Sequence, residues 1–149
     1  MDRGTIVEEQ PYRVDGKTLL IIDDDVEWTD LLRVFFSDKY QVLVANRADE
    51  AIDIIRQESP KAIILDLIMP SVDGFGLMHR MNEMSLGGVP TVLTTGWDSA
   101  DVQECAALVG CSAVLAKPVS LVELEAVVSS LMDGAGHHPP QRANEPTGD

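Results

Sequence analysis

The chain has 149 residues, with 11 basic and 25 acidic side chains and a formal net charge of −14. A negative charge of this size repels a phosphate backbone, so we expect no direct contact with DNA or RNA. The length suits one domain, and no apolar run approaches the roughly 20 residues that are needed to span a bilayer. Since the first residues also lack a signal-peptide pattern, we expect a cytoplasmic protein without membrane contact.

Two cysteines, Cys105 and Cys111, are too few for a disulfide framework and have no neighbours that would complete a zinc site. We expect both to be reduced thiols in or near the core. Redox chemistry is therefore not indicated.

Both ends of the chain have the composition of segments that do not fold by themselves. Residues 1–16 mix Pro, Gly and charges without a period, and residues 133–149 are rich in Gly and Pro. Such segments bury too little apolar surface to offset the entropy cost of ordering. We predict a flexible N-terminal segment at 1–16, one domain at 17–132 and a disordered C-terminal tail at 133–149.

Five short apolar runs between these ends are predicted to be strands. They cover residues 18–22, 41–45, 61–65, 90–94 and 112–116. The runs are almost continuously apolar, whereas a strand with one exposed face would alternate polar and apolar residues. This pattern is typical of a parallel sheet that is covered on both faces.

Between these runs, apolar residues recur at the spacing of amphipathic helices. The first helix is predicted after Asp25, with one apolar face formed by Trp28, Leu31, Leu32 and Phe35. The second repeats the pattern through Ala48, Ala51, Ile52 and Ile55.

Turn and capping signals predict three more helices. One follows the Asp73-Gly74 turn, and another covers about residues 98–109. Ser120 and Glu123 have the spacing of a capping box, so the last helix is predicted to begin there. Strands that alternate with helices in this way form a doubly wound α/β domain, because right-handed crossovers leave few other connections. We predict a flavodoxin-like (βα)5 fold, with a five-stranded parallel sheet of order 2-1-3-4-5 and helices on both faces.

Polar residues that could bind a ligand or take part in a reaction follow four of the predicted strands. The first strand ends in Asp23, Asp24 and Asp25, and the others are followed by Asp66, Thr95 and Lys117. In an open parallel sheet, ligands collect at the carboxyl ends of the strands, near the point where the strand order reverses. Carboxylates gathered there repel one another unless a cation lies between them, and hard oxygen ligands suit Mg²⁺ or Mn²⁺. The sequence therefore predicts a divalent metal site at this edge.

These segments resemble the receiver domain of bacterial two-component response regulators. The similar segments are LLIIDDD at 19–25, LDLIMPSVDG at 65–74, PTVLTTG at 90–96 and KPVSLVEL at 117–124. The resemblance covers about residues 17–132 and is most specific around Asp66. It implies a stand-alone receiver that signals through altered protein binding.

The resemblance implies a role for each site residue. Asp66 would accept a phosphoryl group from a phosphohistidine of a sensor histidine kinase or a histidine phosphotransfer protein. Asp23, Asp24, Asp66 and the main-chain carbonyl of Ile68 would hold Mg²⁺. Thr95 would offer a hydroxyl, and Lys117 a positive charge, to the phosphoryl oxygens. The downstream target and the oligomeric state stay open.

Three positions depart from the usual pattern of the family. Val114 lies three residues before Lys117, where the family usually has a Tyr or Phe that follows phosphorylation. Ile68 and Trp97 occupy positions that border the phosphoryl group and tune its hydrolysis, and both are large and apolar.

Other classes of function fit the sequence less well. A pseudo-receiver scaffold would normally lack one of Asp24, Asp66, Thr95 or Lys117, and all four are present. A phosphatase with an aspartyl nucleophile needs a second Asp two residues later, where this chain has Ile68. A flavin-binding protein would need a phosphate-binding loop after the first strand instead of acids. We therefore expect a signalling module rather than a turnover enzyme.

Overall fold

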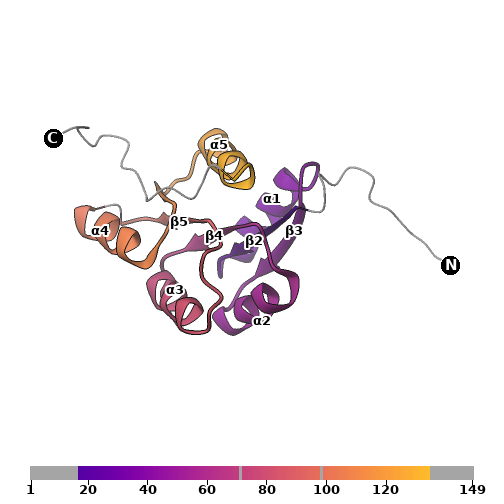
Figure 1. Ribbon diagram of the computed structural model, residues 1–149. Helices are drawn as coiled ribbons and strands as arrows, with labels where there is room; N and C mark the ends of the chain where they lie inside the picture. The colour runs from indigo at the N-terminus through magenta and orange to yellow at the C-terminus, as the bar shows by residue number, and fades with distance from the viewer. Residues whose placement is uncertain (1–16, 71, 98, 135–149) are drawn as a thin grey trace.

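The computed structural model describes residues 17–70, 72–97 and 99–134 (Figure 1). The strands are β2 (Thr18–Ile22), β3 (Gln41–Ala45), β4 (Ala62–Asp66), β5 (Thr91–Thr95) and β6 (Ala113–Ala116). The helices are α1 (Val26–Phe36), α2 (Ala48–Glu58), α3 (Gly74–Glu83), α4 (Ala100–Val109) and α5 (Leu121–Met132). The two kinds of element alternate through the described part of the chain, as the sequence predicts.

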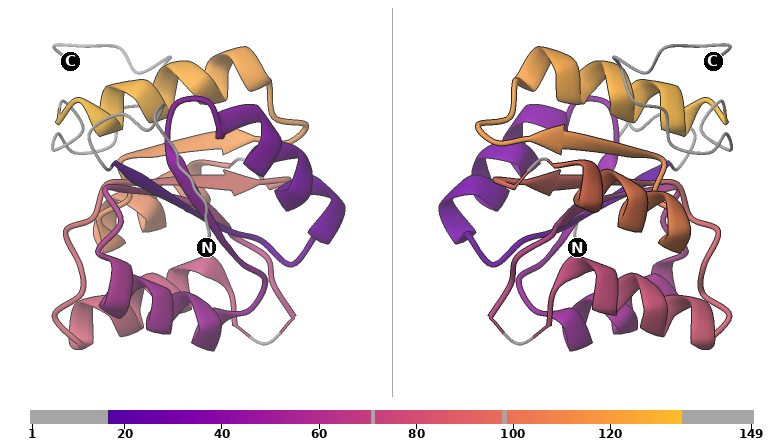
Figure 2. Two further views of the ribbon diagram at one scale, coloured as in Figure 1. Left: turned by 90° about the vertical axis from the view of Figure 1, so that its right-hand side faces the viewer. Right: turned by 90° about the vertical axis from the view of Figure 1, so that its left-hand side faces the viewer.

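The strands form a parallel sheet in the order β3-β2-β4-β5-β6. Counted along the chain, this is the predicted order 2-1-3-4-5, so the flavodoxin-like fold is confirmed. Helices α1 and α5 cover one face of the sheet, and α2, α3 and α4 cover the other (Figures 1 and 2). Because β2 and β4 are neighbours, with Ile22 paired to Leu65, the residues that follow these two strands emerge next to each other.

Each face of the sheet has its own apolar core. On the α1 and α5 side, the strands contribute Leu19, Ile21, Ile64, Val92 and Leu115. On the α2, α3 and α4 side, they contribute Leu20, Ile22, Ile63, Leu65 and Leu93. Side chains thus alternate between two buried layers, which explains the nearly continuous apolar runs.

Side-chain caps set where four of the helices begin. Asp25, Asp73, Ser99 and Ser120 each accept a hydrogen bond from the backbone N–H three residues later. These caps satisfy N–H groups that have no partner inside the helix. Because Ser99 is the cap, α4 begins at Ala100 rather than near residue 98.

Strands β4 and β5 lie one residue later than predicted, and β6 begins one residue later. For β4 the prediction ended with the apolar run at Leu65, but the sheet pairing continues into the polar residue Asp66. The Leu67 N–H donates to the Thr94 carbonyl at 2.9 Å, so Asp66 and Thr94 form a ladder pair. The sheet itself therefore positions the backbone of Asp66 and Thr95.

The buried face of α1 differs from the prediction. Thr29, Leu32 and Phe36 are buried, whereas Leu31 is 48% exposed. Apolar periodicity treats Thr29 as a surface residue, but its hydroxyl donates to the Val26 carbonyl at 3.0 Å and can be buried without losing a hydrogen bond. This shifts the inward face of the helix away from Leu31.

Two further expectations meet the structure only in part. Cys111 is buried, as expected, but Cys105 is exposed on α4, so its placement near the core was wrong; both cysteines are free. The expected flexible segments at 1–16 and 133–149 lie outside the described residues, except for 133 and 134. No helix in the described ranges has the length and apolar character to cross a membrane.

The neighbouring leucines of α1 provide a matched test of packing. We predict that Leu32→Ala lowers the free energy of unfolding by about 2–5 kcal/mol, because it leaves a cavity in a closed core. Leu31→Ala should cost less than about 1 kcal/mol. Urea unfolding followed by circular dichroism measures both values. Equal losses would contradict the orientation of α1.

Candidate functional site

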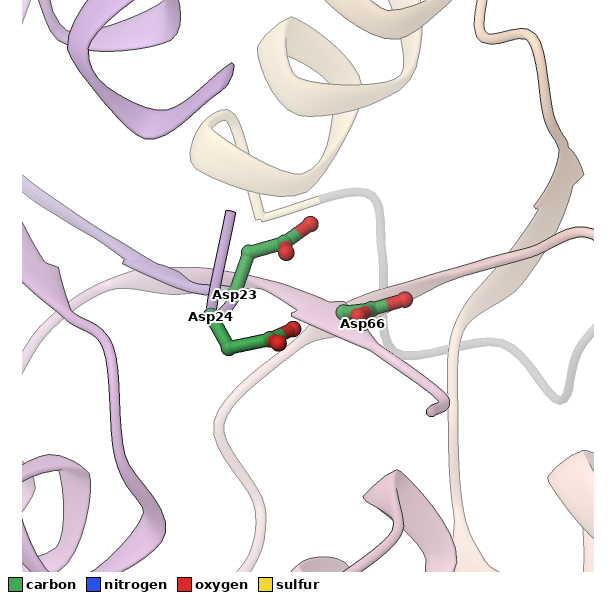
Figure 3. Close-up of side chains that lie close together, drawn as sticks. All are labelled: Asp23, Asp24 and Asp66. Atoms are coloured by element: carbon green, nitrogen blue, oxygen red, sulfur yellow. The ribbon is translucent and has the colours of Figure 1, made fainter. Parts of the chain in front are cut away.

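Three carboxylates meet at the carboxyl ends of β2 and β4. Asp23 and Asp24 follow β2, Asp66 is the last residue of β4, and their side chains lie together (Figure 3). One carboxylate oxygen from each residue lies within 4.8 Å of the others. Asp23 and Asp66 are each 3% exposed, whereas Asp24 is open to solvent. Asp25 instead caps α1, since its Oδ1 accepts from the Trp28 N–H at 3.1 Å.

Lys117 brings a positive charge to this group from the end of β6. Its Nζ donates to Asp66 Oδ1 at 2.9 Å and lies 3.9 Å from Asp23 Oδ2. One ammonium therefore faces two buried carboxylates, and a third carboxylate is adjacent. The excess negative charge makes the site a place for a cation.

Burial is the largest cause of a raised pKa at Asp23, which is about 6 instead of 3.8. The negative charges of Asp66 and Asp24 raise this pKa further, while the Asp25 N–H and Lys117 lower it. Partial burial tends to lower the pKa of Lys117, but its hydrogen bond to Asp66 and the charges of all three carboxylates outweigh burial and raise it. Lys117 thus stays an ammonium, and Asp23 takes up a proton at a higher pH than an ordinary aspartate does.

Two residues without a predicted role support this geometry. Asn46, which follows β3, donates from Nδ2 to the Asp23 carbonyl at 2.7 Å and anchors the end of β2. Gly74 lets the loop after β4 fold back, because a Cβ there would lie 2.9 Å from the Asp66 main-chain oxygen. The position of Asn46 directly after a strand could have indicated its place at the site edge. The close approach at Gly74 depends on tertiary structure and has no such signal in the sequence.

The structure does not bring every expected residue into contact with the carboxylates. Thr95 is fully buried, and its Oγ1 accepts from the Trp97 N–H at 2.8 Å. Ile68 is 51% exposed and Trp97 is 70% exposed, so both belong to the surface near the site. Val114 is half-buried and packs against the core on the α2, α3 and α4 side. Roles for Thr95, Ile68 and Trp97 stay predictions.

A small groove lies beside the carboxylates, between the start of α1 and the segment that joins β6 to α5. Its lining residues are Asp25, Trp28, Lys117, Pro118 and Val119, and its volume is about 230 Å³. Lys117 therefore borders both the carboxylates and this groove.

Residues 19–129 match the family model of the response regulator receiver domain, and the chain belongs to that family. A receiver domain is a signalling module rather than a turnover enzyme, which confirms that expectation. Receiver domains are phosphorylated by histidine kinases, and the acidic group of Asp23, Asp24 and Asp66 is typical of their Mg²⁺ site.

Similar proteins include small and large chains. An uncharacterized 14.6 kDa protein of Leptolyngbya boryana is 34% identical over 108 residues, which cover 71% of this chain and 82% of that protein. Response regulator Rre1 of Synechocystis is 30% identical, over 77% of this chain and 51% of its own length. The chain thus spans about half the length of several curated relatives.

Solved receiver structures share the fold. A two-component response regulator from Clostridium difficile has a TM-score of 0.72 at 25% identity, over 78% of this chain and 96% of that one. The Francisella response regulator 1452 receiver domain has a TM-score of 0.74 at 24% identity, over 80% of this chain and 99% of that one.

The donor set fits a divalent cation. Three carboxylates offer hard oxygen atoms within reach of one ion, and the described part of the site adds no His or Cys ligand that would favour a softer metal. An ion there would also offset the charge that Lys117 alone leaves uncompensated. The residues present therefore suit Mg²⁺ or Mn²⁺.

We predict that Mg²⁺ stabilises the folded chain, by about 2.7 kcal/mol at a concentration 100-fold above its dissociation constant. Asp24→Asn should reduce this stabilisation, because it removes one carboxylate from the group. The matched control is Asp25→Asn, which keeps a good helix cap and should respond to Mg²⁺ as the wild type does. Thermal unfolding with and without Mg²⁺ tests this, and a wild-type melting temperature indifferent to Mg²⁺ would contradict a metal site.

Proposed function

We propose that this protein is a phosphoacceptor receiver in which Asp66 takes a phosphoryl group from a phosphohistidine of a sensor histidine kinase or a histidine phosphotransfer protein. The observation that carries this proposal is the buried Asp66 carboxylate, held 2.9 Å from the Lys117 ammonium and beside Asp23 and Asp24. The protein would then signal through altered binding to a downstream protein. We propose that the receiver domain comprises residues 17–132 and that the protein acts in the cytoplasm.

The chemistry needs a nucleophile and compensation of negative charge. An Asp66 carboxylate oxygen forms a bond to phosphorus while the bond from phosphorus to the histidine nitrogen breaks, and the electron pair returns to the imidazole. The Lys117 ammonium, which now donates to Asp66, can instead donate to an oxygen of the phosphoryl group on Asp66. Asp23, Asp24, Asp66 and the main-chain carbonyl of Ile68 would hold Mg²⁺, which would supply positive charge to offset that of the phosphoryl group.

Thr95 is proposed to bind another phosphoryl oxygen. Its hydroxyl now accepts a hydrogen bond from the Trp97 N–H, so this role requires the side chain to turn toward Asp66. The loop that carries Trp97 would then lose a contact. This links phosphorylation to a change in the exposed segment after β5.

We predict that acetyl phosphate with Mg²⁺ adds one phosphoryl mass to the chain and that Asp66→Asn abolishes this addition. Asp73→Asn is the matched control, because Asn can still cap α3 and the residue lies outside the carboxylate group. Intact-mass spectrometry measures the product. An unlabelled wild type would favour the pseudo-receiver alternative, and labelling that persists in Asp66→Asn would place the acceptor elsewhere.

Ile68 and Trp97 are predicted to slow hydrolysis of the acyl phosphate. Water must approach phosphorus in line, and these apolar side chains offer no polar group to orient it. The double variant Ile68→Asn with Trp97→Glu should therefore lose its phosphoryl group faster than the wild type. Phosphoprotein decay after removal of acetyl phosphate gives the rates, and slower decay in the double variant would refute the shielding role.

A further inference from the structure

Thr94 on β5 carries a buried hydroxyl without a hydrogen-bond partner among the described residues. The residue is 1% exposed, and its Oγ1 makes no hydrogen bond. Other buried threonines contrast with it. Thr29 donates to the Val26 carbonyl, Thr91 donates to the Val89 carbonyl, and Thr95 accepts from the Trp97 N–H. Thr94 therefore needs a physical explanation that the fold alone does not provide.

The sheet places Thr94 directly beside Asp66. Thr94 pairs with Asp66 on β4 and with Leu115 on β6, and paired residues of parallel strands project from the same face. For Thr94 this is the α1 and α5 face, because Val92, two residues earlier, and Leu115 belong to that core. The hydroxyl thus lies on the same face as the Asp66 side chain.

The side chain of Lys117 passes over the same place. Lys117 continues the ladder of β6, since its N–H donates to the Thr95 carbonyl at 2.8 Å, and it shares the face of Leu115 two residues before it. Its Nζ bonds Asp66 Oδ1 on β4, so the Lys117 stem crosses β5, which lies between β6 and β4. Thr94 therefore lies on the strand that the Lys117 side chain crosses, and on the same face of the sheet as Asp66.

Of the two residues paired with Thr94 on the neighbouring strands, Asp66 is the one whose side chain offers a hydrogen-bond acceptor. The partner on the other side, Leu115, has no polar side-chain atom, and the Val92 side chain below is also apolar. In the described state Lys117 Nζ donates to Asp66 Oδ1, and the Thr94 hydroxyl makes no hydrogen bond to this carboxylate. A threonine hydroxyl can change direction by rotation about χ1 and by rotation of its own O–H bond.

We propose that Thr94 is a positioning residue for the phosphorylated state, in which its hydroxyl donates to the Asp66 oxygen that Lys117 releases. This rests on the proposed function of Asp66. When a phosphoryl group draws the Lys117 ammonium toward its own oxygens, the Asp66 carbonyl oxygen loses a donor, and the unpartnered Thr94 hydroxyl on the neighbouring strand turns to supply one. A hydroxyl that is unsatisfied in one state and bonded in the other favours the second state.

The test uses the full chain and beryllofluoride with Mg²⁺ as a phosphoryl mimic. Thr94→Val keeps the shape of the side chain and removes the hydroxyl. We expect it to bind beryllofluoride about 3- to 10-fold more weakly than the wild type, while its stability in urea without the mimic is unchanged or higher. Thr94→Ser keeps the hydroxyl, and its affinity should stay close to that of the wild type.

Thr91→Val is the matched control on the same strand. It removes a hydroxyl that bonds the Val89 carbonyl at 2.9 Å, far along β5 from Asp66, and should lower stability without changing beryllofluoride affinity.

Equal affinity of Thr94→Val and the wild type would overturn the role of Thr94 while leaving Asp66 as acceptor. If Thr94→Val were unstable, weaker binding by Thr94→Ala than by Thr94→Ser would support the proposal, and equal binding would overturn it. A wild type that neither binds beryllofluoride nor accepts a phosphoryl group would remove the proposed function itself.

Discussion

The repulsion among three carboxylates at one edge of the sheet is the interaction on which the site depends. Asp23, Asp24 and Asp66 have oxygens within 4.8 Å of one another, and one ammonium, that of Lys117, compensates two of them directly. Burial is the main reason that the pKa of Asp23 is raised, and the charges of Asp66 and Asp24 raise this pKa further. Positive charge brought by a metal ion would offset the repulsion among these carboxylates, so the cluster suits a cation.

The parallel sheet makes this crowding possible. Since β2 and β4 are neighbours, their carboxyl ends place Asp23 and Asp66 next to each other, and two apolar cores hold the strands from both faces. Asn46 anchors the end of β2, and Gly74 allows the loop after β4 to approach the Asp66 main chain. The packed sheet thus holds the like charges close together. Ile68 and Trp97 lie in exposed loops.

Strand β5 connects the site to both cores through two adjacent threonines. Thr94 lies on the α1 and α5 face beside Asp66, and Thr95, one residue later, lies on the opposite face and bonds the Trp97 N–H. Thr94 thus faces the α1 and α5 core, and Thr95 holds the start of the segment after β5. Val114 has no ring to swing, so any change at Asp66 has to reach the surface without an aromatic residue on β6.

The sequence alone determined the alternation of elements, the parallel sheet and the strand ends that carry Asp23, Asp24, Asp66 and Lys117, because apolar periodicity and chain order are local properties. It did not determine which side of α1 is buried, and the prediction for Leu31 was wrong, because burial of Thr29 depends on a hydrogen bond within the helix and on the sheet beneath it. Only the tertiary structure decided that the Thr94 hydroxyl has no hydrogen-bond partner among the described residues and that Gly74 lies close to the Asp66 main chain. Both facts arise from contacts between strands and loops distant in sequence, and no local pattern encodes such distances.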